Sequence, residues 1–136
     1  MSKIILNRID YARIKKSISD AKQFKSISNA EAEKLINELD SATIVEPEAI
    51  PSNVVTMNSI VKIRFLNTDK EVQFQIVYPH LANVKENKIS IFSPIATALI
   101  GYKVKDEIEW IVPAGLTKLR IEKIVYQPEA SGDYDL

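Results

Sequence analysis

The spacing of apolar residues changes near the middle of this chain, and the change limits the folds that it can adopt. Up to residue 46, apolar side chains recur every three or four positions, which is the period of an amphipathic helix. From residue 54 they alternate with polar side chains, as in a half-buried strand. Pro47 and Pro51 lie between the two patterns, where neither can continue a helix. The sequence therefore predicts an α+β fold: a helical hairpin at residues 1–46, a linker at 47–53 and a sheet domain at 54–136.

Two short amphipathic helices are predicted in the front of the chain. Asn7 and Asp10 can cap the first helix, whose apolar face consists of Tyr11, Ile14, Ile18 and Ala21. Ser28 and Glu31 have the spacing of a capping box for the second helix, whose apolar face consists of Ala32, Leu35, Ile36 and Leu39. The break between the helices is short, so they must run antiparallel. Each helix is about 20 Å long at 1.5 Å per residue.

The remainder of the chain predicts an antiparallel sheet with one short helix. Alternating runs around residues 61–65 and 72–76 are joined by a turn at 67–70, which is typical of a hairpin. Apolar positions within 89–91, 108–112 and 119–124 indicate further strands. A short helix is expected between them, with Ser93 as N-cap, Pro94 at its first position and Gly101 as C-cap.

Composition excludes several classes of protein. The 18 Lys and Arg residues balance the 18 Asp and Glu residues, so no strong direct binding to nucleic acid is expected. The chain has no cysteine, which excludes disulfides, thiolate zinc sites and a cysteine nucleophile. The N-terminus lacks a signal-peptide pattern and no apolar run is long enough to span a bilayer. These features predict a cytoplasmic protein with no membrane contact.

Residues that could carry catalysis are few. His80 is the only histidine, and a general base there is conceivable, but its position after Pro79 favours a surface loop. The three glycines form no phosphate-binding pattern. Acidic pairs could hold magnesium, yet each pair stands where a solvated surface needs charge: Glu31 and Glu33, Glu46 and Glu48, Asp106 and Glu107, Asp133 and Asp135. We therefore expect no catalytic residue, no metal, no cofactor and no enzyme activity.

Several segments carry a resemblance to a known family. Residues 89–101, with the sequence ISIFSPIATALIG, resemble the strand, Ser-Pro turn and small helix at the C-terminal end of the GreA/GreB transcript elongation factors. Val104, Asp106, the PAG at residues 113–115 and the IEKIVY at residues 121–126 follow in that family's order. Residues 54–59 and 126–134 further resemble the branch of the family known as regulators of nucleoside diphosphate kinase.

The resemblance implies an FKBP-like fold for the sheet domain and RNA polymerase as the partner. In this family the sheet domain docks on the coiled coil at the rim of the polymerase secondary channel, with the helical hairpin pointing into the channel. The residues expected at the docking edge of this chain are Ile91, Phe92, Ser93 and Pro94. Phe92 stands where the elongation factors often have an acidic residue, so an apolar contact is expected there. We expect the protein to be a monomer.

The hairpin tip departs from the relatives that stimulate transcript cleavage, which use acidic residues at the tip to help hold a catalytic magnesium ion. Here the tip consists of Lys25, Ser26, Ile27, Ser28 and Asn29, without an acid. The helices are also shorter than those of GreA or GreB. The resemblance therefore implies a regulator that competes with cleavage factors at the channel without stimulating cleavage itself.

Two other functions remain open from the sequence. An FKBP-like pocket lined by Phe92, Tyr102 and Trp110 would suit a prolyl isomerase. The same aromatic side chains on strands would equally form part of the core. A protein-binding module with no role in transcription is the third possibility.

Overall fold

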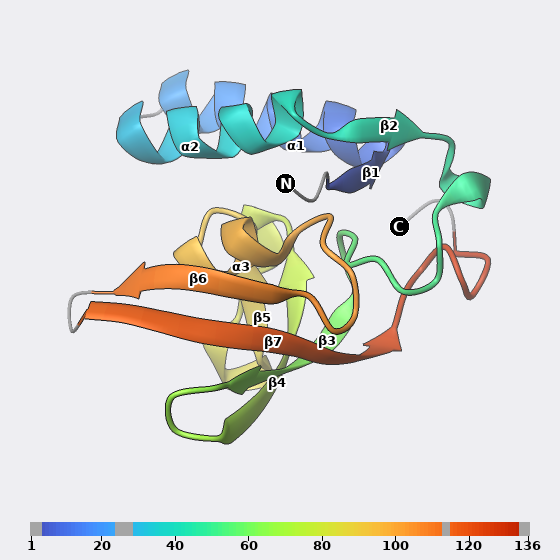
Figure 1. The fold of residues 1–136 in the computed structure, drawn as a ribbon. Coiled ribbons are helices and arrows are strands. Elements are labelled where there is room, and N and C mark those ends of the chain that lie inside the picture. Colours follow the sequence, from blue (N-terminus) through green and yellow to red (C-terminus); the bar gives the residue numbers. More distant parts are fainter. Residues whose placement is uncertain (1–3, 24–28, 113–114, 134–136) are drawn as a thin grey trace.

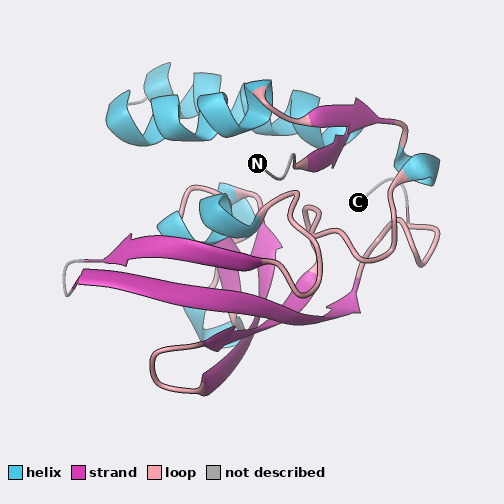
Figure 2. Ribbon diagram, viewed as in Figure 1, coloured by secondary structure: helices cyan, strands magenta, loops and turns pink. Residues whose placement is uncertain are grey.

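The computed structural model describes residues 4–23, 29–112 and 115–133. These residues form two long helices, one short helix and two sheets (Figures 1 and 2). The helices are α1 (Arg8–Gln23), α2 (Asn29–Asp40) and α3 (Pro94–Leu99). The strands are β1 (Ile5–Asn7), β2 (Thr43–Val45), β3 (Ile60–Phe65), β4 (Lys70–Val77), β5 (Lys88–Ser90), β6 (Glu107–Val112) and β7 (Gly115–Tyr126). Single turns of 3-10 helix lie at Pro47–Ala49, Pro79–Leu81 and Val84–Glu86.

The structure has two layers, as Figure 1 shows. Helices α1 and α2 lie side by side in opposite directions in the upper layer, and the larger sheet forms the lower one, with α3 between them. No helix in the described part of the chain is long and apolar enough to cross a membrane. The mixed α+β class predicted from the change of apolar period is confirmed.

The larger sheet has the strand order β5-β4-β3-β7-β6. The predicted β-hairpin is confirmed, because β3 pairs with β4 in antiparallel register, with Ile63 opposite Val72. The prediction of a wholly antiparallel sheet is wrong at the edge, where β5 pairs parallel with β4. Residues 78–87 pass through two 3-10 turns instead of one tight turn, and this crossover brings β5 back in the same direction as β4.

A second sheet, formed by β1 and β2, was not predicted. Its strands are three residues each and pair in parallel, with Leu6 opposite Ile44. Strands this short cannot show an alternating pattern, so the sequence gives no periodic signal for them. The pairing brings together the two ends of the helical segment, because β1 immediately precedes α1 and β2 follows α2.

Most of the predicted apolar face of each helix is buried, whereas Tyr11 and Ile36 are only partly buried. Ile14, Ile18 and Ala21 of α1, and Ala32, Leu35 and Leu39 of α2, are each at most 6% exposed. These side chains belong to one hydrophobic cluster that also contains Val55, Met57, Ile63, Leu99 and Ile121. One core therefore includes side chains from both sides of residues 47–53, the segment that the sequence predicted as a linker.

Cap residues explain where the helices begin. Asn7 caps α1 as predicted, because its Oδ1 accepts a hydrogen bond from the Asp10 backbone amide at 2.7 Å. Asp10, the other predicted cap residue, is instead the third residue of the helix and is buried. The capping box predicted for the second helix involves Ser28, which lies outside the described residues, as does Phe24.

Candidate functional site

The loop that joins β5 to α3 contains the residues expected to dock on a partner, and short hydrogen bonds fix its conformation. The Ser93 backbone amide donates to the Ser90 carbonyl at 2.9 Å, and the Phe92 amide donates to Ser90 Oγ at 3.0 Å. Ser93 Oγ accepts from the Ala96 amide at 3.3 Å, which makes Ser93 the predicted N-cap, and Pro94 is at the start of α3. The loop is thus a rigid turn at one edge of the sheet.

The predicted docking residues differ in exposure. Phe92 and Ser93 are partly exposed, whereas Ile91 is completely buried in the core. The Ile91 amide donates to the Val77 carbonyl at 2.9 Å, and its carbonyl accepts from Thr97 Oγ1 at 2.8 Å. Ile91 therefore anchors the loop from beneath, and the accessible part of the loop begins at Phe92.

The other residues considered from the sequence do not form a catalytic arrangement. His80 is exposed in the 3-10 turn after β4, as expected for a surface loop. The predicted hairpin tip lies outside the described residues except for Asn29, which begins α2. Among the described residues, no three histidines or carboxylates are grouped as a metal site would require.

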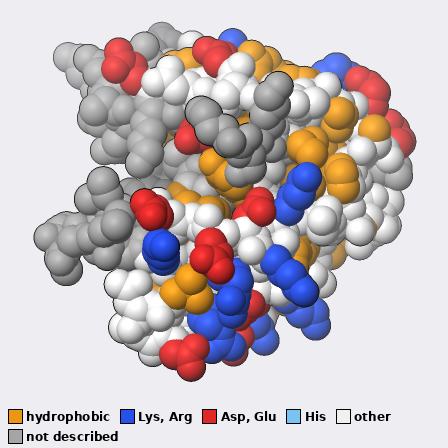
Figure 3. Space-filling view, viewed as in Figure 1, with side chains coloured by type: hydrophobic (Ala, Val, Ile, Leu, Met, Phe, Trp, Pro, Cys, Tyr) orange, Lys and Arg blue, Asp and Glu red, His pale blue; other side chains and the backbone are white. Residues whose placement is uncertain are grey.

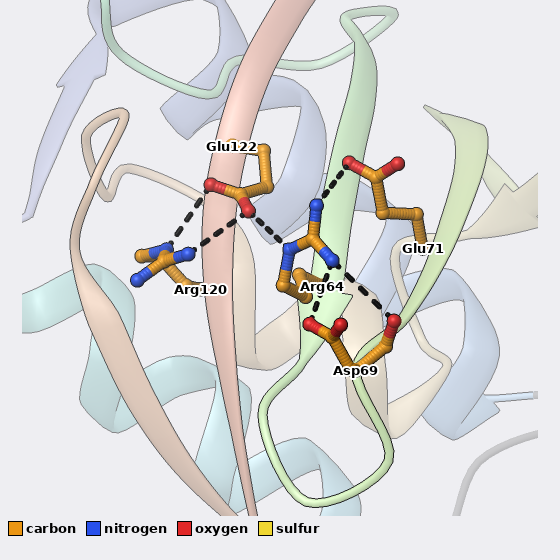
Figure 4. Close-up of polar contacts among 5 residues, drawn as sticks. All are labelled: Arg64, Asp69, Glu71, Arg120 and Glu122. Carbon is orange, nitrogen blue, oxygen red and sulfur yellow. Dashed lines mark hydrogen bonds and ion pairs between the residues drawn. The ribbon is translucent and has the colours of Figure 1, made fainter.

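The open face of the sheet carries a network of ion pairs centred on Arg64 (Figure 4). Its guanidinium contacts Glu122 at 2.6 Å, Asp69 at 2.7 Å and Glu71 at 3.0 Å. Glu122 also accepts two hydrogen bonds from Arg120, both at 3.1 Å. The two guanidinium groups lower the pKa of Glu122 to about 2. The strand register creates this network, since β3 places Arg64 between Glu71 of β4 and Arg120 of β7.

Opposite charges are intermixed on this side of the molecule. Figure 3 shows acidic and basic side chains side by side over the lower part of the view, where the sheet lies. Such a surface neutralises itself locally, in agreement with the balanced composition. It gives no broad basic patch of the kind that duplex nucleic acid requires.

A second polar network is buried between the start of α1, the segment before β3 and the segment after β7. Asn7 Nδ2 donates to Glu129 Oε2 at 2.5 Å, and Thr56 Oγ1 donates to Glu129 Oε1 at 2.8 Å. The Met57 backbone amide donates to Asp10 Oδ2 at 3.1 Å. Asn7, Asp10 and Glu129 are at most 9% exposed. We call these contacts the Asp10–Glu129 network.

Two carboxylates in one buried network affect each other's ionisation. Burial raises the pKa of Asp10 to about 7, and the nearby negative charge of Glu129 adds to the effect. The Met57 amide and the Tyr78 hydroxyl, which donate to Asp10, act in the opposite direction. Asp10 therefore keeps its proton to a higher pH than an exposed aspartate does. The sequence could not reveal this network, because Asn7 and Glu129 lie 122 positions apart.

Comparison with known proteins gives consistent matches over most of the chain. The family model described as "Transcription elongation factor, GreA/GreB, C-term" matches residues 50–126. The regulator of nucleoside diphosphate kinase from Escherichia coli K12 is 40% identical over 133 residues, which cover 96% of this chain and 95% of the relative. Transcription elongation factor GreA from Orientia tsutsugamushi is 37% identical, with coverage of 89% and 86%.

A solved structure agrees with these sequence matches. The transcription elongation factor GreA/GreB from Nitrosomonas europaea superimposes with a TM-score of 0.74 at 36% identity. The superposition covers 91% of this chain and all of the solved chain. The matched family segment, residues 50–126, contains both the Ser93 loop and the Arg64 network.

Proposed function

Because this chain belongs to the GreA/GreB family of transcription elongation factors, we propose that it regulates transcription by binding RNA polymerase at the rim of the secondary channel. The observation that carries the proposal is the family match over residues 50–126, which includes the Ser93 loop. In this proposal residues 54–136 form an FKBP-like domain and residues 1–46 a helical hairpin joined to it by residues 47–53. The place of action is the bacterial cytoplasm.

The docking edge that we propose consists of Phe92, Ser93 and Pro94, held in place by buried Ile91. A loop that is already ordered loses little conformational entropy on binding. Phe92 offers a partly exposed aromatic ring, the type of side chain that often contributes most to an interface. The partner is the coiled coil at the channel rim, and the protein binds there as a monomer.

The proposal includes no catalytic role. The tip at residues 25–29 has no acid that could help hold magnesium in the channel. With 16 residues in α1 and 12 in α2, the helices extend only about 24 and 18 Å. A bound protein would thus block the channel mouth and exclude longer factors without stimulating cleavage. The relatives named above give no support to the prolyl isomerase alternative.

Binding to core RNA polymerase tests the docking edge most directly. Ser93→Asp is the informative variant, because Asp caps a helix as well as Ser but adds a charge to the proposed contact. We expect at least about tenfold weaker binding, with unchanged circular dichroism. Val125→Arg is the matched control, since it puts a charge on an exposed apolar position of β7 away from the loop. Equal polymerase affinity of Ser93→Asp and the wild type would remove this loop from the interface.

Competition tests the function itself. Added to a cleavage reaction stimulated by GreA, the protein should slow cleavage, and an excess of GreA should restore it, because occupancy follows concentration and the ratio of dissociation constants. The protein alone should not stimulate cleavage. If it binds polymerase but leaves GreA-stimulated cleavage unchanged at saturation, the two proteins occupy different sites. If it does not bind polymerase at all, a protein-binding role outside transcription would replace the proposal.

A further inference from the structure

A cavity of about 450 Å³ lies between α1 and the segments that flank the sheet. Arg13, Lys16 and Ser17 line it from α1, and Asn58, Tyr78 and His80 line it from the opposite side. Its volume is in the range of pockets that bind small molecules. None of these residues belongs to the Ser93 loop, so the cavity is separate from the proposed docking edge.

Asn58 is the feature of this cavity that most clearly points to a ligand. The residue as a whole is only 9% exposed, and its side-chain amide makes no hydrogen bond with any described residue but is open to the cavity. The backbone of Asn58 is in a left-handed conformation (φ 67°) and is held there by two hydrogen bonds. The Asn58 backbone amide donates to the Ile76 carbonyl at 2.6 Å, and the Asn58 backbone carbonyl accepts from Gln75 Nε2 at 2.8 Å. An amide that is held in place and open to a cavity can bond a ligand without first breaking a bond within the protein.

The side chains around Asn58 are mainly hydrogen-bond donors. Lys16 forms no ion pair with a described residue, and neither the Ser17 hydroxyl nor the His80 ring has a hydrogen-bond partner among them. Arg13 is engaged with the Tyr78 hydroxyl, and its guanidinium has five N–H donors in all. With Asp20 as the one acidic lining residue in the described part, the cationic side chains outnumber it. Donors that line one cavity from two sides suit an anion with several oxygen acceptors.

We propose that this cavity binds the phosphate group of a small molecule. Lys16 and Arg13 would supply charge, and Asn58 and Ser17 would donate hydrogen bonds to the phosphate oxygens. The cavity is larger than one phosphate, and Leu81 at its edge is 49% exposed, so it offers an apolar surface to the rest of the ligand. A nucleotide has this combination of parts. Because the ligand would touch both α1 and the segment after β4, it would strengthen the contact between them.

Isothermal titration of the full-length protein at constant ionic strength tests the proposal, with inorganic phosphate and GTP as separate probes. The wild type should bind at least one probe saturably, and the bound probe should raise the melting temperature. Lys16→Gln and Asn58→Gly should each weaken binding at least about tenfold. Glycine adopts the positive φ of position 58 freely, so Asn58→Gly removes the amide without straining the backbone. Tighter binding of GTP than of phosphate would show that the apolar edge contributes, and equal binding that the phosphate alone is recognised; both support the site.

Lys15→Gln is the matched control. Lys15 is the neighbouring residue on α1, has the same charge, and lies over the Tyr11 ring outside this cavity. Its binding should stay within about twofold of the wild type. The proposal is overturned if the wild type binds neither probe saturably. It is equally overturned if folded Lys16→Gln and Asn58→Gly variants bind as tightly as the wild type and Lys15→Gln.

Discussion

The two polar networks of this protein differ in burial, and the difference determines how much each contributes to stability. The Arg64 network pairs opposite charges at distances down to 2.6 Å, but water reaches most of its members, and Asp69 is 84% exposed. The Asp10–Glu129 network contains like charges and neutral donors, yet its three central residues are almost inaccessible. Exposed ion pairs contribute little because water and salt screen them, whereas a buried polar group that loses its partner pays the full cost of desolvation.

The buried network also joins parts of the chain that are far apart in sequence. Asn7 and Asp10 begin α1, Thr56 precedes β3, and Glu129 follows β7. The Ile5 amide adds a backbone bond to the Gly101 carbonyl at 3.1 Å. Together these contacts hold the upper layer on the sheet. In the proposed function the helices act as a rigid block at the channel mouth, and that role requires such a connection.

The largest effect is expected where this connection is tightest. Gly101 has φ 83°, and a Cβ placed on it would be 2.6 Å from Ile4 Cβ and 3.2 Å from the Ile5 backbone. Gly101→Ala should therefore lower the free energy of unfolding by about 4 kcal/mol, from left-handed strain plus overpacking. Gly132 has nearly the same φ, 79°, but nothing within 4 Å. Gly132→Ala should cost only about 1 kcal/mol in urea unfolding. Equal costs would show that backbone strain, and not the contact with β1, dominates at both positions.

Asn7→Ala should remove about 3 kcal/mol. The variant loses the cap of α1, worth about 1 kcal/mol, and one donor to a buried carboxylate, worth about 2 kcal/mol. Thermal and urea unfolding measure the loss. Ser41→Ala is the control. The Ser41 hydroxyl also donates a hydrogen bond at the end of a helix, to the Glu38 carbonyl, but in an exposed position. If both variants lose the same small amount, burial of the Asp10–Glu129 network does not matter.

The pH dependence of stability tests the carboxyl of Asp10. Its pKa in the folded protein is about 7, above the ordinary value of 3.8, so between these values the folded protein holds a proton that the unfolded chain has released. Stability should therefore fall steadily as pH rises from about 4 to about 7 and should level off above the folded pKa. Glu129, Tyr78 and Arg13 are the titratable or charged groups that affect Asp10.

The magnitude is best measured against Asp10→Asn, which stays neutral. From pH 5 to pH 8 the wild type should lose on the order of 2 kcal/mol relative to this variant. At pH 8 the variant should be the more stable of the two, provided that its amide keeps the bond from the Met57 amide. Parallel stability profiles of the two proteins would mean that Asp10 is not protonated in the folded state.

Local sequence patterns predicted the longer elements of this fold, but not the three-residue strands β1 and β2 or all of the strand pairings. The spacing of apolar residues around Ile14 and Leu35 gives the helical period, and the spacing around Val61 and Phe74 gives the strand period, because side-chain direction repeats within each element. The parallel pairing of β5 depends on how residues 78–87 cross, and no local pattern records that path. The three-residue strands β1 and β2 are likewise fixed by contacts between distant segments.

The candidate sites show the same division. The conformation of the Ser93 loop was predictable, because a helix cap and a proline at the first helical position act within four residues. The cavity at Asn58 and the raised pKa of Asp10 could not be predicted, because each depends on contacts between residues of different elements. Asp10 was interpreted as a cap because its type suits a helix start, and only its burial shows its other role.

The smallest effect is expected on the open face of the sheet. Arg64→Gln breaks three ion pairs, but Glu122 keeps its two bonds from Arg120, and no buried group is left without a partner. The loss of stability should be clearly smaller than that of Asn7→Ala, and 0.5 M NaCl should reduce it further, because the screening length becomes only a few ångströms.

Lys62→Gln on the same strand is the control. Lys62 lies opposite Lys123, so the same loss of charge relieves a repulsion and should not lower stability. The comparison fails if Arg64→Gln loses as much stability as Asn7→Ala and if salt does not change that loss. The Arg64 network would then be shielded from water, and burial would not explain a difference between the two networks.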